Sequence, residues 1–117
     1  MKIYKIAQSK LHVWLDDERD PKDANVKKLF GTNGSEIWIK TIEPIQQLIL
    51  QNQVGFIDFD NDLGEGIAEG RVLAQWIEEK AFKKEIEPIE WHVHSQNSIA
   101  AKEISKAMSN ADRFWKN

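Results

Sequence analysis

Two short segments of the chain concentrate carboxylates. LDDER (Leu15–Arg19) and DNDLG (Asp60–Gly64) each follow directly on an apolar run. Like charges about 4 Å apart repel by roughly 4 kcal/mol at an effective dielectric near 20, so open solvent or a cation must offset the repulsion. Carboxylate oxygens suit a hard divalent cation, which keeps open positions for phosphate oxygens. We therefore expect Mg²⁺ or Mn²⁺, held mainly by Asp16, Asp17 and Asp60.

A third polar segment, HSQN (His94–Asn97), also follows an apolar run. The imidazole of His94 titrates near neutrality, which makes it a candidate general acid or base. Ser95 is a second candidate for the chemistry. Asn97 is a candidate donor to phosphate oxygens, although beginning the next helix together with Ser98 is an equally good reading.

Other residues near these segments are weaker candidates for a functional role. Arg19, Asn61 and Asp62 are candidate substrate contacts, although Arg19 could simply pair with an acid. Asp58 lies on the same strand face as Asp60, and a buried structural carboxylate is as good a reading as a ligand. His92 forms an H-x-H pair with His94 but, in mid-strand, it is expected to be a core histidine. Trp14, Trp38, Trp76 and Trp91 are expected to be core or flanking residues.

The elements that must position these side chains alternate along the chain. Apolar runs predict strands at residues 11–15, 54–59 and 89–93, and an alternating apolar–polar pattern predicts a strand at 35–41. Helical spacing predicts helices at 41–53, 71–82 and 98–115, and a short irregular helix is expected around 24–30. The expected apolar faces are Val72, Leu73, Trp76 and Ile77 on the helix at 71–82, and Ala100, Ile104, Ala107, Met108 and Ala111 on the helix at 98–115. Such alternation predicts parallel strands joined by right-handed crossovers, in a three-layer α/β sandwich. The carboxyl ends of the strands then share one edge, where ligands bind. If the first and third strands are neighbours, the two acidic segments meet there.

Composition limits the class of protein. The chain has 117 residues, 41% hydrophobic and 30% charged, which predicts one domain over residues 1–117, with residues 1–10 a possible extra strand or extension. A net charge of −3 gives no sign of a nucleic-acid coat or a membrane surface, and there is no DNA-binding motif. The absence of cysteine excludes disulfides, thiolate metal sites and a cysteine nucleophile. Without an apolar span or a signal-like N-terminus, we expect a cytoplasmic protein.

The three segments together resemble the cyclic-phosphate processing receiver-like domains, small relatives of the response-regulator receiver domain. That family carries LDDxRxP, DHDLG and HSxN in this order, matching Leu15–Pro21, Asp60–Gly64 and His94–Asn97 here. The resemblance spans roughly residues 11–113. It implies a receiver-like (flavodoxin-like) fold with a mostly parallel sheet of four to five strands. It also implies an acidic metal pocket, with Asp60 at the position of the receiver phosphoacceptor.

The resemblance implies metal-assisted hydrolysis of cyclic phosphates on nucleotides or RNA ends, with partner proteins in RNA repair or signalling. Asp60 could alternatively attack phosphorus itself. Two further functions stay open: a non-catalytic module that binds the same ligands, and a divergent phosphorylatable receiver. Two features depart from the related patterns. Asn61 stands where the family has histidine, which favours binding without turnover. No fifth apolar strand with a following lysine is present, which disfavours an ordinary receiver.

Overall fold

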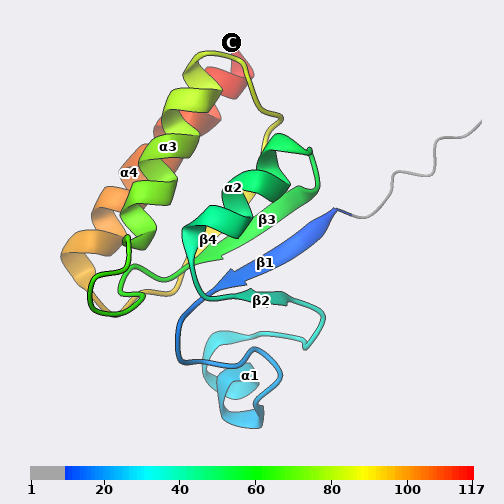
Figure 1. The fold of residues 1–117 in the computed structure, drawn as a ribbon, viewed down its shortest axis with the longest axis vertical. Helices are drawn as coiled ribbons and strands as arrows, with labels where there is room; N and C mark the ends of the chain where they lie inside the picture. Colours follow the sequence, from blue (N-terminus) through cyan, green and yellow to red (C-terminus); the bar gives the residue numbers. More distant parts are fainter. Residues whose placement is uncertain (1–9) are drawn as a thin grey trace, which may run out of the picture.

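Strands and helices alternate along residues 10–117, the part of the chain that the computed structural model describes (Figure 1). The possible extra strand at residues 1–10 therefore lies almost entirely outside the described residues. Each predicted element is present, although the second strand is much shorter than predicted. The strands are β1 (Leu11–Leu15), β2 (Ile37–Ile39), β3 (Val54–Phe59) and β4 (Glu90–Val93), and the helices are α1 (Ala24–Phe30), α2 (Ile42–Leu50), α3 (Gly70–Phe82) and α4 (Ser98–Lys116).

The four strands form one parallel sheet in the order β2-β1-β3-β4. Leu15 of β1 is in register with Phe59 of β3, which is in register with Val93 of β4. The first and third strands are therefore neighbours, as predicted. Because these three residues end their strands, the segments that follow them leave the sheet side by side.

The two faces of the sheet are covered differently. Val13, Leu15, Ile57 and Phe59 point to one face and share a core with buried residues of α2, α3 and α4. Trp14 points to the opposite face because side chains alternate along a strand. Its ring packs edge-on against Phe30 of α1, 6.1 Å away. Figure 1 shows α1 apart from the other three helices, so it alone forms the third layer in the described part of the chain.

The helices follow their apolar patterns with one exception. The predicted stripe of α4 is buried throughout: Ala100, Ile104, Ala107, Met108 and Ala111. The predicted apolar face of α3 is wrong at Val72, which is 39% exposed, because Leu73, Ala74, Ile77 and Ala81 form the buried face instead. No helix among residues 10–117 is long and apolar enough to cross a membrane.

Candidate functional site

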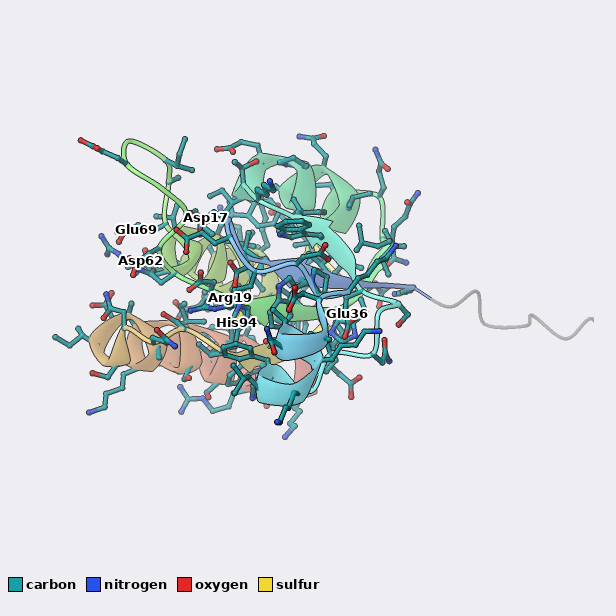
Figure 2. The ribbon with its side chains drawn as sticks, turned by 90° about the horizontal axis from the view of Figure 1, so that it is seen from below. Asp17, Arg19, Glu36, Asp62, Glu69 and His94 are labelled. Carbon is teal, nitrogen blue, oxygen red and sulfur yellow. The ribbon has the colours of Figure 1, made fainter. Side chains whose placement is uncertain are left out.

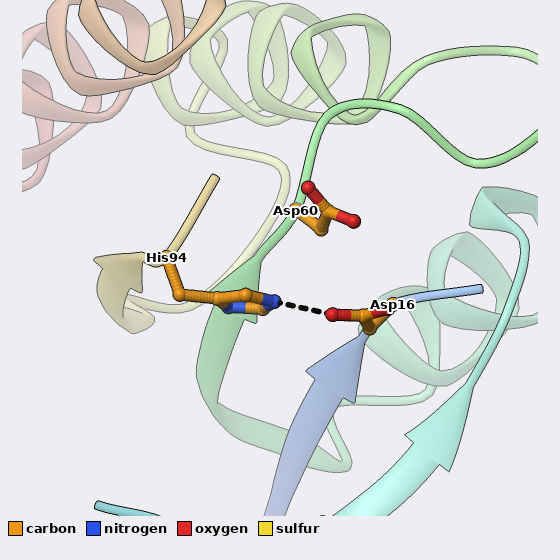
Figure 3. Close-up of side chains that lie close together, drawn as sticks. All are labelled: Asp16, Asp60 and His94. Atoms are coloured by element: carbon orange, nitrogen blue, oxygen red, sulfur yellow. Dashed lines mark hydrogen bonds and ion pairs between the residues drawn. The ribbon is translucent and has the colours of Figure 1, made fainter. Parts of the chain in front are cut away.

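Three polar side chains meet at the carboxyl edge of the sheet. Asp16, Asp60 and His94 follow β1, β3 and β4 directly, and all three are buried (Figure 3). The sheet ladder extends to them: the amide of Asp60 donates to Leu15 at 3.0 Å, and the amide of His94 donates to Phe59 at 2.9 Å. Each of the three side chains offers a ligand atom within 4.8 Å of the others, so this group could hold a metal ion. The backbone of the sheet therefore fixes the group.

Asp16 is fully paired within the chain. One carboxylate oxygen accepts the amides of Glu18 and Arg19, both at 2.9 Å. The other accepts Nη1 of Arg19 and Nε2 of His94, both at 3.0 Å. Burial raises the pKa of Asp16, but these hydrogen bonds outweigh it and lower the pKa to about 2. Asp16 is therefore ionised at neutral pH, and both of its oxygens are held by donors of the chain.

His94 lies between two carboxylates. Its Nδ1 contacts Asp58 at 2.8 Å while Nε2 contacts Asp16, and its ring stacks on Trp14 with 3.8 Å between centroids. A carboxylate accepts but cannot donate, so both ring nitrogens must carry protons. Burial lowers the pKa of His94, but the hydrogen bonds to Asp16 and Asp58, together with the negative charges of these carboxylates, have the larger, opposite effect. The net pKa of His94 is therefore raised above the ordinary value for histidine. The side chain, 1% exposed, is thus a buried imidazolium.

Asp58 supports the site from behind. Its carboxylate also contacts Nδ1 of His92 at 3.1 Å. The prediction of a core histidine at position 92 is wrong, because the side chain of His92 is 62% exposed. Asp58 was predicted to be either a metal ligand or a buried structural carboxylate. The structure supports the structural role, because the buried Asp58 carboxylate orients the ring of His94.

Asp60 is the least compensated acid of the buried group. One oxygen accepts the amide of Asn61 at 2.8 Å, and the other lies 3.9 Å from Nη1 of Arg19. Burial, together with the negative charge of Asp16, raises the pKa of Asp60. The guanidinium of Arg19 thus reaches both Asp16 and Asp60, and it lies over the ring of Phe30 at 5.0 Å.

A hollow of about 650 Å³ opens beside Asp60. Its acids come from both acidic segments and from the loop before α3, and Figure 2 shows Asp17, Asp62 and Glu69 gathered at this end while Glu36 lies apart. Asp16 and His94 lie behind the wall and do not line it. The lining residues are Asp17, Glu18, Arg19, Asp60, Asp62, Leu63, Gly64, Glu65, Gly66, Ile67, Glu69 and Gln96.

Asn61 has a structural role here. Its side chain is fully buried and does not line the hollow. The amide nitrogen donates to Asp62 at 3.1 Å and to Glu69 at 3.0 Å, and the amide oxygen accepts the backbone N–H of Arg71 at 3.1 Å. Asn61 therefore joins the acidic loop to the start of α3.

Gly70 allows α3 to begin against the site. A Cβ added to Gly70 would lie 1.9 Å from the backbone oxygen of Asp60, which is closer than any side chain permits. The amide of Gly70 donates to the carbonyl of Asn61 at 2.8 Å. The missing side chain lets α3 brace the loop that carries Asp60.

The HSQN segment divides between the hollow and α4. The Asn97 side chain caps α4 by accepting the amide of Ala100 at 3.1 Å, and the Ser95 hydroxyl accepts the amide of Asn97 at 3.2 Å. Gln96 is the residue of this segment that lines the hollow. We did not single it out from the sequence, although its place between His94 and Asn97 could have indicated it.

Two tryptophans hold the first acidic segment. Nε1 of Trp14 donates to the carbonyl of Arg19 at 2.8 Å, and Nε1 of Trp38 donates to the carbonyl of Asp16 at 2.7 Å. The sequence suggested only core or flanking roles for them. Their strand positions next to the acids were the available indication, but the direction of an indole N–H depends on packing.

A parallel α/β sheet with acids directly after β1 and β3 is consistent with a receiver-like domain. The family model of the cyclic-phosphate processing receiver domain matches residues 11–110. The chain therefore belongs to this family, and both the resemblance and the predicted fold are confirmed. No curated protein and no solved structure matches the chain.

Proposed function

We propose that the chain hydrolyses cyclic phosphates on nucleotides or RNA ends in the hollow beside Asp60. The observation that carries the proposal is the buried group of Asp16, Asp60 and His94, brought together by three strands in a chain that belongs to a cyclic-phosphate processing family. In the reaction, water attacks phosphorus, one bond from phosphorus to a ribose oxygen breaks, and that oxygen takes up a proton.

A divalent cation fits the carboxylates of the site. Asp60 has one oxygen without a close partner among the described residues, and its raised pKa reflects burial and the negative charge of Asp16. The proposed ligands of Mg²⁺ or Mn²⁺ are Asp60 and Asp17, which line the hollow, together with Asp16, whose carboxylate would exchange its bond to the Arg19 side chain for the cation. When bound, the cation polarises a phosphoryl oxygen and lowers the pKa of its water.

His94 is proposed to act through Asp16. The proton stays on the imidazole because Nδ1 and Nε2 both face carboxylates, which accept hydrogen bonds but cannot donate them. The resulting imidazolium holds the Asp16 carboxylate in a fixed orientation. His94 is therefore proposed as a positioning residue and a source of positive charge, and the leaving oxygen takes its proton from water in the hollow.

Polar donors around the hollow are proposed to orient the phosphate. Arg19 lines the hollow, and its guanidinium can donate to the non-bridging oxygens. Ser95 and Asn97 do not line the hollow but flank Gln96, which does; the Ser95 hydroxyl proton and the Asn97 amide protons remain available, because the hydrogen bonds of these side chains use their oxygens as acceptors. Asp62 faces the substrate, whereas Asn61 acts through the loop it braces.

Turnover of 2′,3′-cyclic nucleotides tests the proposal. We expect activity with Mg²⁺ or Mn²⁺, loss with chelator, and at least a hundredfold loss in Asp60→Asn. Glu87→Gln, a change at an exposed acid away from the site, should keep full activity. Activity of Asp60→Asn equal to that of the wild type would refute the assignment. Equal metal affinity of the two proteins in a direct titration would refute the ligand role separately.

Binding without turnover is the second candidate. It is favoured because no histidine lines the hollow in the described part of the chain: His94 is buried behind it, and position 61 is a buried asparagine. Saturable binding of a 2′,3′-cyclic nucleotide that is recovered unchanged after long incubation would establish this candidate over hydrolysis.

Asp60 offers a different covalent route. The Asp60 oxygen that accepts no hydrogen bond within residues 10–117 could attack phosphorus and form an aspartyl-phosphate, as its receiver-like position allows. Labelling of the wild type but not of Asp60→Asn by acetyl phosphate would support this route.

A further inference from the structure

The solvent-facing side of α4 carries a row of positive charges. Lys102, Lys106, Arg113 and Lys116 recur at spacings of four, seven and three residues, which places them on one side of a helix. All four are exposed, and they lie opposite the buried stripe of the same helix. We call these four residues the α4 stripe. At 1.5 Å per residue it extends about 20 Å.

The acids of α4 do not neutralise the α4 stripe. Glu103 lies beside it and pairs with Arg71 at 3.5 Å, and Asp112 accepts the indole N–H of Trp91 at 3.0 Å. None of the three lysines takes part in an ion pair among the described residues. The chain as a whole carries a net charge of −3, so the positive charge of the α4 stripe is confined to this surface.

The α4 stripe leads away from the hollow. Gln96 lines the hollow, and α4 begins two residues later at Ser98. Figure 1 shows the start of α4 at the same end of the molecule as the loop between β3 and α3, while its other end lies far from that loop. A chain with one end in the hollow can therefore continue along the helix.

We propose that the α4 stripe binds the phosphodiester backbone of a single-stranded RNA whose terminal cyclic phosphate enters the hollow. This inference rests on the proposed function and names its substrate as an RNA end rather than a free cyclic nucleotide. Acids line the hollow with Arg19 as their only basic neighbour in the described lining, so the hollow repels a polyanion. The attraction for the body of the strand must come from cations outside it.

An anionic membrane is a poorer match for this surface. A helix that lies on a membrane inserts its apolar face between the lipids. The apolar face of α4 is occupied by the core, where Ile104 and Met108 are completely buried. A narrow row of exposed cations with no free apolar face fits a phosphodiester strand better.

Matched charge-removal variants test the α4 stripe. Lys102→Gln/Lys106→Gln removes two of its charges, and Lys22→Gln/Lys28→Gln removes two exposed charges before and within α1. The probe is a fluorescent single-stranded RNA of about ten nucleotides with a 2′,3′-cyclic end, titrated at several salt concentrations. Each lost phosphate contact reduces the slope of log K against log salt by about 0.7, so we expect the first variant to lose about 1.4. The control should match the wild type.

The outcomes separate the two proposals. A wild-type slope in the α4 variant, an equal loss in the control, or binding to phosphatidylserine vesicles instead of RNA would overturn the RNA inference. Turnover of a 2′,3′-cyclic mononucleotide, measured in parallel, should be equal in all three proteins. Its absence from the wild type would overturn the hydrolytic function, while the salt slopes would still decide whether the α4 stripe binds RNA.

Discussion

Replacing Asp16 by asparagine removes the charge on which the buried site depends. The asparagine side chain has nearly the same shape, but only one acceptor oxygen for the four hydrogen bonds that Asp16 receives. At least one donor among Arg19, His94 and the backbone amides then loses its partner, and the buried imidazolium loses one of its two counter-charges. We therefore expect Asp16→Asn to destabilise the fold rather than only impair function.

The size of the effect follows from two estimates. The pKa of Asp16 falls from 3.8 to about 2, which corresponds to about 2 kcal/mol of stability. Hydrogen bonds to charged groups contribute about 1.5–3 kcal/mol each. The two estimates describe overlapping contacts, so the expected loss is about 2–4 kcal/mol rather than their sum.

Urea unfolding with chelator present measures this loss through tryptophan fluorescence. Asp17→Asn is the matched control: it is the same substitution one position away, on a side chain without a hydrogen bond among the described residues, and should change stability by less than about 0.5 kcal/mol. A loss below about 1 kcal/mol in Asp16→Asn, or an equal loss in the control, would refute the reasoning.

The pH dependence gives a second check of the same charge. The folded pKa of Asp16 lies below its unfolded value, so its contribution is complete above pH 3.8 and is lost as the pH falls through about 2. The difference in unfolding free energy between wild type and Asp16→Asn should therefore shrink between pH 4 and pH 2. A constant difference over that range would show that the carboxylate charge is not its source.

Three further variants and one control variant probe neighbouring contacts. His94 has a raised folded pKa, so its stabilisation is complete below pH 6.5 and is lost as the pH rises through the folded value. The difference in unfolding free energy between wild type and His94→Gln should therefore narrow as the pH rises above 6.5, and a constant difference would contradict this. Gly70→Ala places a methyl group against the carbonyl of Asp60 and should lower the free energy of unfolding in urea by about 1–3 kcal/mol. An increase in stability would instead show only the general preference of helices for alanine over glycine, and would contradict the clash. Trp38→Phe should cost at least about 1 kcal/mol, because a carbonyl of the acidic segment loses its donor. Trp76→Phe, at an indole nitrogen without a hydrogen bond among the described residues, should cost less, and the reverse order in thermal unfolding would be evidence against the contact.

The order of strands and helices was predictable because each apolar run has a length and period typical of one element. Details set by side-chain bonds were not. The second strand was predicted from residue 35, but the Glu36 carboxylate accepts the amides of Asn33 and Gly34 at 3.0 and 2.9 Å, which makes this stretch a turn. On α3, hydrophobicity predicted that Val72 would be buried, but Val72 is exposed and Ala74 is buried. A small residue such as Ala74 lets α3 and α4 approach closely.

The location of the site was predictable, but its internal pairing was not. Parallel strands bring their carboxyl ends to one edge, so residues 16, 60 and 94 had to lie close together. Sequence spacing does not say whether His94 faces solvent or turns inward. That depends on the flat stack with Trp14 and on Asp58, which captures the second ring nitrogen.

The acids gathered at the carboxyl edge of the sheet repel one another. In the structure, some of the buried acids are paired with positive charges of the chain and one is left largely uncompensated. Asp16 and Asp58 are paired with internal cations, His94 and Arg19, which fold together with them. The ion pair of Asp60 with the Arg19 guanidinium is long, at 3.9 Å. Of the three residues Asp16, Asp60 and His94, Asp60 is the one that lines the hollow. The uncompensated negative charge therefore lies where a ligand can reach it. A divalent cation bound there would offset part of the negative charge of the hollow and supply a positive centre for a phosphate oxygen, so the repulsion between the carboxylates would favour binding of the cation.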